Sequence, residues 1–206
     1  SDLLSVLNDR VQNVLKKRGE ITPGGLVTML DDAWSDRVEG IVRSVGKSVW
    51  QDMKDKGRLI TYNTAGRGGG MQLMALLAPL RDTIRLHLVG HSAGAIVHAY
   101  LADWLVTQGW NIASASFLAP AATVELFDSR IQPHLQSRKL GRYAQFHLQD
   151  ALERAEGGAM RLVLGYRRSL LYLVSNALEE RAHMPVLGMA NFFDTTVAPR
   201  NLPHLQ

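Results

Sequence analysis

Residues 85–118 read RLHLVGHSAGAIVHAYLADWLVTQGWNIASASFL, and this stretch decides the class of fold. A short apolar run at 85–89 is followed by apolar residues at helical spacing over 93–108, and a second short apolar run at 112–118 follows Gly109. A strand, a helix and another strand in this order are typical of a parallel sheet covered by helices. The stretch therefore predicts an α/β fold.

The same periodicity, followed outward in both directions, predicts the other elements. The whole chain reads as a single domain over 1–206, in which residues 1–57 are largely helical and residues 58–206 form the sheet core. The predicted helices cover 3–17, 32–56, 71–81 and 169–181, with helical turns at 124–127 and 131–140, and the predicted strands cover 59–63, 143–148 and 186–193.

The composition excludes several classes of protein. The chain has 206 residues, of which 46% are hydrophobic and 20% charged, and it has no cysteine, so disulfides, thiolate zinc sites and a cysteine nucleophile are ruled out. The net charge of +4 is spread along the chain rather than gathered into a tract, which argues against nucleic acid as a partner. With neither a membrane-spanning run nor a basic, apolar signal segment at its start, the chain is expected to be cytoplasmic.

The motif that carries chemistry is Gly90-His91-Ser92-Ala93-Gly94, which fits the G-x-S-x-G nucleophile elbow. The predicted strand directly before it and the predicted helix directly after it are the neighbours that this motif requires. The alternative is a serine that only caps the helix or helps to bind an anion at its start.

Sterics explain the spacing of this motif. A nucleophile on a tight strand-to-helix turn has strained backbone angles, and side chains two positions before or after it would collide with the crossing backbone, so we expect Gly90 and Gly94 to keep the approach open. The helix that begins at Ala93 directs its unpaired N–H groups at the place where an oxyanion would form. Ala93 N–H is therefore the candidate oxyanion donor.

The sequence resembles the α/β-hydrolase superfamily, and more narrowly a set of bacterial α/β-hydrolase-like serine hydrolases. This resemblance implies a mostly parallel, eight-stranded sheet with helices on both faces and a catalytic triad in the chain order serine, acid, histidine. The matching text lies between residues 50 and 189 and comprises WQDMK, HLVGHSAGAIVHAYL, FLAPAATVELF, FHLQDALERAE, RSLLYLVSNALEE and PVLGM.

Asp150 is the candidate triad acid, because it follows the predicted strand at 143–148 and comes after Ser92 in the chain. Glu153, one helical turn further on, is the second candidate. The alternative for Asp150 is a helix N-cap for residues 151–156.

The candidate histidine is His204, the one histidine that follows the last predicted strand. The others fail on position: they lie on the elbow or its flanking elements, precede Asp150, or fall at the wrong end of a strand, and they are His87, His91, His98, His134, His147 and His183. The alternative for His204 is an ordinary histidine in a tail, which carries no function.

Two parts of the resembling family have no counterpart in this sequence. In the relatives, the histidine lies in a Ser-His-Gly-Gly-type loop beyond the last strand, and a His-Gly-Gly-type loop after an early strand supplies a second oxyanion donor. We expect the early strands before Ser1 or around residues 19–32, and the histidine loop near or beyond Gln206. The alternative is a degenerate hydrolase that has lost its base.

Other features of the sequence are weaker candidates. Gly68-Gly69-Gly70 is interpreted as a flexible loop rather than an oxyanion loop, with Gly24-Gly25 a weaker candidate for that role. Motifs for a metal or a nucleotide are lacking, so neither a metal nor another cofactor is expected. Three arginines are interpreted as part of a solvated face, with attraction of an anionic substrate as the alternative: Arg130, Arg138 and Arg142.

Together these residues predict a serine-dependent acyl hydrolase that cleaves a small carboxylic ester through an acyl-enzyme, in the manner of an esterase or lipase. Two alternatives stay open. One is a non-catalytic binding protein on the same fold, and the other is a serine peptidase or thioesterase. The sequence makes no prediction of the oligomeric state.

Overall fold

A computed structural model describes residues 31–63, 65, 68–156, 166 and 168–198. The predicted helix at 3–17, the Gly24-Gly25 pair and His204 lie outside these residues. The chain divides into two compact units, Ser1–Asp52 with Gln149–Met184 and Met53–Leu148 with Pro185–Gln206. We refer to the first as the helical unit and to the second as the sheet unit.

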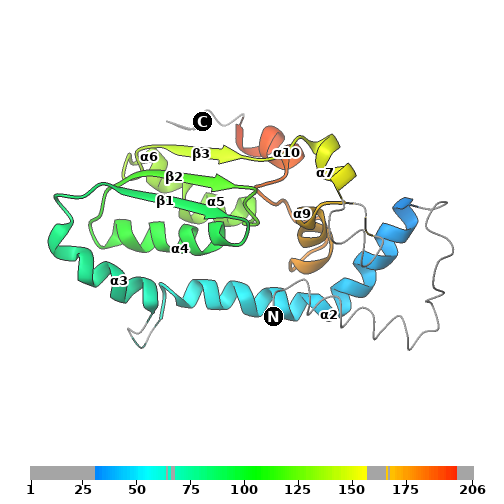
Figure 1. Ribbon diagram of the computed structural model, residues 1–206, viewed down its shortest axis with the longest axis horizontal. Helices are drawn as coiled ribbons and strands as arrows, with labels where there is room; N and C mark the ends of the chain where they lie inside the picture. Colours follow the sequence, from blue (N-terminus) through cyan, green and yellow to red (C-terminus); the bar gives the residue numbers. More distant parts are fainter. Residues whose placement is uncertain (1–30, 64, 66–67, 157–165, 167, 199–206) are drawn as a thin grey trace. The chain divides into compact units, whose positions relative to one another are not determined.

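The sheet unit contains three parallel strands that pair in the order β1-β2-β3 (Figure 1). They are β1 Leu86–His91, β2 Ile112–Leu118 and β3 Tyr143–Phe146. Each was predicted from the sequence, and β2 has the predicted bounds, so the α/β class is confirmed. Within the described residues the sheet has three strands, whereas the family resemblance implies eight.

Helices connect the three strands, as a parallel sheet requires. The helix α4 Gly94–Thr107 joins β1 to β2, and α5 Val124–Arg130 with α6 Gln132–Gln136 joins β2 to β3. The start of α5 is capped by Thr123, whose hydroxyl accepts a hydrogen bond of 3.1 Å from the Leu126 N–H. In Figure 1, α4 and α5 lie on the same side of the sheet.

The core lies between this side of the sheet and its helices. Leu88, Ala115 and Phe117 alternate with exposed or half-buried residues along β1 and β2, and all three are buried. The Tyr143 ring of β3 meets the rings of Phe117 and Phe127 edge-on, with centroids 5.5 and 5.2 Å away. The aromatic contacts therefore tie α5 to two of the three strands.

The opposite side of the sheet is exposed in the described part of the chain. Val89, Leu118 and Phe146 point to this side and keep 63%, 40% and 59% of their surface exposed. The expected helices on both faces are thus found on one face of the described sheet.

A cluster of hydrogen bonds around Asp103 joins α4, α5 and α6. One oxygen of its carboxylate accepts from the Tyr62 hydroxyl at 2.6 Å and from Arg130 at 2.5 Å, and the other lies 2.8 Å from His134 Nε2. Burial opposes ionisation of Asp103, but the hydrogen bonds from Tyr62, Arg130 and His134 outweigh it and lower its pKa. Arg130, predicted to lie on a solvated face, is instead part of this cluster.

The strand predicted at 59–63 is wrong. The helix α2 Asp31–Leu59 runs through the first of these residues, and the chain then turns, with the Thr61 N–H donating to the Arg58 carbonyl at 3.1 Å. The short helix α3 Gly69–Leu77 and the turn η1 Ala78–Leu80 follow, close to the predicted helix. Gly68 is needed here because an added Cβ would lie 2.4 Å from the Ile60 carbonyl oxygen.

The strand predicted at 186–193 is also wrong. Val186 makes one isolated antiparallel bridge with Thr123, and the Gly188 N–H donates to the Pro120 carbonyl at 2.8 Å. The chain then enters two short helical turns, α10 Ala190–Phe192 and η3 Phe193–Val197.

The core of the helical unit contains buried polar side chains among its apolar ones. Its described elements besides the first part of α2 are α7 Asp150–Glu156, α9 Leu170–Leu173 and η2 Val174–Leu178. The Glu39 carboxylate of α2 is buried and accepts hydrogen bonds from Tyr166 at 2.7 Å and from Asn176 at 2.9 Å.

None of the described helices has the length and apolar character needed to cross a membrane.

Candidate active site

Ser92 directly follows β1 and adopts a left-handed backbone conformation, with φ of 52°. Its N–H donates to the Leu118 carbonyl at 3.0 Å, and its own carbonyl accepts from the N–H groups of Ala95 at 3.1 Å and Ala121 at 3.0 Å. A serine with a positive φ has a strained backbone, and such strain persists only where surrounding contacts hold the backbone in place. These three hydrogen bonds hold the bend that an elbow requires, and Ser92 itself is half-buried.

The two glycines of the motif have different steric roles. A Cβ added at Gly90 would lie 2.9 Å from the His98 side chain and 3.1 Å from the Ala95 nitrogen, so this position needs glycine. A Cβ added at Gly94 would meet nothing within 4 Å among the described residues. The expected collision is therefore confirmed at Gly90, while at Gly94 the prediction is wrong because the helix start faces open space.

Ala93 is the N-cap residue of α4 and Gly94 is its first residue, so no preceding helical turn supplies a carbonyl for their N–H groups. The positive end of the helix dipole lies at the same place. An anion placed beside Ser92 at the start of α4 would thus meet both an N–H donor and a favourable field.

His98 lies on α4 beneath Gly90, and its ring stacks on Phe117 at a centroid distance of 6.4 Å. Burial lowers its pKa, although a hydrogen bond to the backbone of Val89 opposes that shift. His98 is therefore a neutral packing residue under the elbow strand, which agrees with its structural interpretation from the sequence.

The three strands end in register, so the residues that directly follow them form one row: Ser92, Ala119 and His147. The Ala119 N–H continues the ladder by donating to the Phe146 carbonyl at 2.7 Å. Two strand spacings separate Ser92 from His147, or about 10 Å between backbones. The sheet thus brings a histidine to the edge that carries the serine.

His147 is partly enclosed by its neighbours. Its Nδ1 lies 3.2 Å from the Gln145 amide nitrogen, its Nε2 lies 3.8 Å from an Asp194 carboxylate oxygen, and its ring lies 5.3 Å from that of Phe193. Sequence reasoning set His147 aside because it precedes Asp150. The predicted strand at 143–148 also included His147, and only the observed end of β3 at Phe146 places this residue directly after the strand.

Asp150 belongs to the helical unit, at the first residue of α7. Its carboxylate accepts from the Tyr172 hydroxyl at 2.5 Å and from Arg154 at 2.7 Å. The Tyr172 hydrogen bond lowers the pKa of Asp150, and Arg154 adds to this effect against a smaller opposing effect of burial. The carboxylate is thus ionised, as a triad acid must be, but its role stays a prediction.

The remaining predicted residues are placed as follows. Glu153 is buried in α7. His204 lies outside the described residues, so its role also stays a prediction. Over the described ranges, histidines and carboxylates form no group of three or more that could hold a metal ion.

A small cavity of about 150 Å³ lies against the start of α4. Its lining is mostly apolar, with one lysine, and comprises Met53, Lys54, Gly57, Ala93, Gly94, Ile96 and Val97. A space of about this size holds a benzene-sized apolar group.

Comparison with protein-family models, with curated proteins and with solved structures finds no match to this chain.

Proposed function

We propose that this protein is a serine-dependent acyl hydrolase of the α/β-hydrolase type, acting on carboxylic esters. The observation that carries the proposal is the backbone of Ser92, whose φ of 52° places it on a sharp bend between a parallel strand and a helix. Two further features support it: the close approach at Gly90 and the N–H groups at the start of α4.

In the proposed reaction, Ser92 Oγ attacks the ester carbonyl while a histidine takes its proton. The Ala93 N–H donates to the oxyanion that forms, and collapse of this intermediate expels the alcohol, which receives the proton from the histidine. Water, activated by the same histidine, then cleaves the acyl-enzyme and restores the Ser92 hydroxyl. No step requires a cofactor.

Two histidines are candidates for the base. His204, with Asp150 as its acid, follows from the sequence order of the resembling family. His147 is supported by its place in the same row as Ser92 and by the nearby Asp194 carboxylate. In the second arrangement Asp194 takes the orienting role at His147 Nε2, and Nδ1 takes the Ser92 proton after the Gln145 amide, which lies 3.2 Å away, turns aside.

The cavity beside Ala93 and Gly94 supports a short acyl group as the preferred substrate part. At about 150 Å³ it has room for an acyl chain of a few carbons but not for a long fatty chain.

Hydrolysis of p-nitrophenyl esters tests the proposal. We expect turnover of the acetate and butyrate esters to exceed that of the dodecanoate, and Ser92→Ala to abolish it. The variants His147→Ala and His204→Ala assign the base, because only the loss of the true base lowers kcat by orders of magnitude. Turnover that survives in Ser92→Ala would contradict the proposal, and a folded, inactive wild-type protein would favour the binding-protein alternative.

A further inference from the structure

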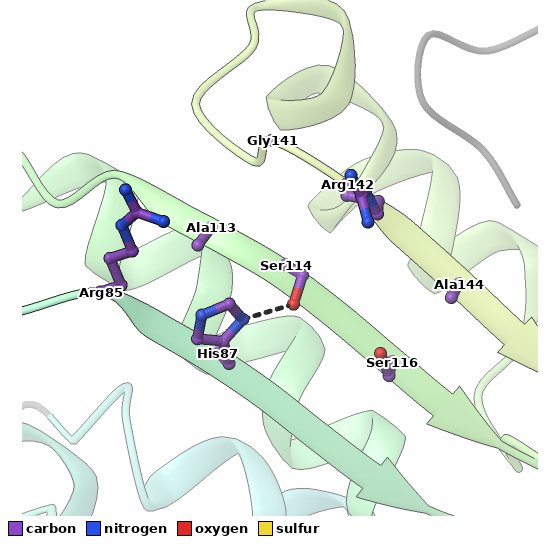
Figure 2. A pocket seen from close by; sticks show the side chains of 8 residues that line it. All are labelled: Arg85, His87, Ala113, Ser114, Ser116, Gly141, Arg142 and Ala144. Atoms are coloured by element: carbon purple, nitrogen blue, oxygen red, sulfur yellow. Dashed lines mark hydrogen bonds between the residues drawn. The ribbon is translucent and has the colours of Figure 1, made fainter.

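The exposed side of the sheet carries a polar row at the amino ends of the strands. His87 of β1 is paired in register with Ser114 of β2, and the pair Ala115–Tyr143, one residue further on, places Arg142 beside Ser114. The row therefore runs His87, Ser114, Arg142 across the three strands. Figure 2 shows these side chains on one face, with Arg85 beside them.

This row lines a hollow of about 510 Å³. Its floor consists of small residues, which are Ala113, Ser114, Ser116, Gly141 and Ala144. Gly141 has no room for a side chain, since an added Cβ would lie 2.9 Å from the Ala113 carbonyl oxygen. Small residues between the longer side chains of Arg85, His87 and Arg142 thus leave a hollow on the exposed side of the sheet.

The rim is cationic. Arg85 directly before β1 and Arg142 directly before β3 line the hollow, and among the described residues its lining includes no aspartate or glutamate. Across the described residues, neither guanidinium makes a hydrogen bond or an ion pair with the protein. Two unpaired guanidinium groups that face one hollow attract an anion and can each donate two hydrogen bonds to it.

The floor supplies further donors. The Ser114 hydroxyl lies 2.7 Å from His87 Nδ1, which orients the imidazole and leaves its other ring nitrogen for a ligand. Ser116 adds a second hydroxyl one row along the sheet. Hydrogen-bond donors of the two arginines and of the floor then surround a ligand in the hollow on several sides. This arrangement suits a tetrahedral oxyanion better than a planar carboxylate.

We propose that this hollow is a binding site for a phosphate group, carried by a small ligand or free in solution. The site is separate from Ser92: four residues along β1 separate His87 from His91, which precedes Ser92, a distance of about 13 Å. The phosphate site therefore does not depend on the proposed hydrolase activity.

Titration of the whole chain with inorganic phosphate, followed by ¹H–¹⁵N NMR at constant ionic strength set with chloride, tests this site. We expect saturable shifts at the amide groups of Ser114 and Ser116, and about tenfold weaker binding in Arg142→Gln and in Arg85→Gln. The matched control is Arg138→Gln, because Arg138 lies in the neighbouring hollow and does not line this one. That variant should bind phosphate as the wild type does.

Two results would overturn the site: phosphate shifts no larger than those caused by chloride, or equal weakening in Arg138→Gln and Arg142→Gln. A parallel titration with glycerol phosphate identifies the source of the ligand. Tighter binding of glycerol phosphate assigns a phosphate ester and tighter binding of inorganic phosphate assigns the free ion, and either order supports the site if Arg142→Gln weakens it.

Discussion

At the scale of single residues, four described residues other than glycine have a positive φ: Ser92, Ala119, Arg138 and His183. Two of the three residues in the row after the strands, Ser92 and Ala119, have a positive φ, of 52° and 41°. A positive φ raises the conformational free energy of any residue that has a Cβ. Residues with this conformation cluster at functional sites. The sequence motif predicted the bend at Ser92, because its flanking glycines and elements are specific. It gave no signal at Ala119, where tertiary hydrogen bonds impose the conformation.

The strain at Ser92 can be measured without any substrate. Ser92→Gly should be more stable than Ser92→Ala by about 1 kcal/mol, because glycine adopts a positive φ freely whereas alanine keeps the strained Cβ. Urea denaturation followed by circular dichroism gives the difference in the free energy of unfolding. Equal stability of the two variants, or a more stable alanine variant, would show that residue 92 does not adopt this bend.

At the scale of elements, the sequence predicted correctly those helices and strands whose apolar pattern is long or clearly bounded, and it failed where the apolar run is short. The three observed strands and α4 have long or well-bounded apolar patterns, and their predicted bounds were nearly right. The runs at 59–63 and 186–193 are too short for periodicity to separate a strand from a turn or helix. Their conformations are decided by tertiary contacts, such as the hydrogen bond from Gly188 to Pro120.

The Asp103 cluster holds α4, α5 and α6 together, so its loss should destabilise the sheet unit. Asp103→Asn should lower the free energy of unfolding by about 2 kcal/mol at pH 7. The substitution removes the negative charge that accepts the hydrogen bonds from Arg130 and Tyr62. Asp82→Asn, which alters a carboxylate whose side chain is 91% exposed, is the matched control and should change stability by less than about 0.5 kcal/mol.

The same cluster predicts a pH dependence. The pKa of Asp103 is lower in the folded protein than its unfolded value of about 3.9. Its contribution is therefore fully present above that value and is lost as the pH falls through the folded pKa, where the folded state takes up the proton. Thermal unfolding between pH 7 and pH 3 should show this loss in the wild type and a smaller one in Asp103→Asn. An identical pH profile for the two proteins would refute the role of the cluster.

At the scale of the whole molecule, the α/β class predicted from the sequence is confirmed, whereas the predicted triad of Ser92, Asp150 and His204 stays a prediction. Chain order linked Asp150 to Ser92, yet these residues belong to different units and the Asp150 carboxylate already accepts from Tyr172 and Arg154. His147 reaches the edge of Ser92 through strand register, which becomes visible only once the pairing of the strands is known. A single sequence gives little information about which distant residues the tertiary structure brings close together.

The central claim is that Ser92 is a nucleophile, and covalent labelling of the full chain with a fluorophosphonate, followed by peptide mass spectrometry, tests it most directly. Ser114 is an internal control, because its hydroxyl lies 2.7 Å from His87 Nδ1 although the residue is not on a strand-to-helix bend. We predict a single adduct on Ser92 that is lost in Ser92→Ala and kept in Ser114→Ala. An unlabelled wild-type protein, or an adduct that persists in Ser92→Ala, would contradict the claim.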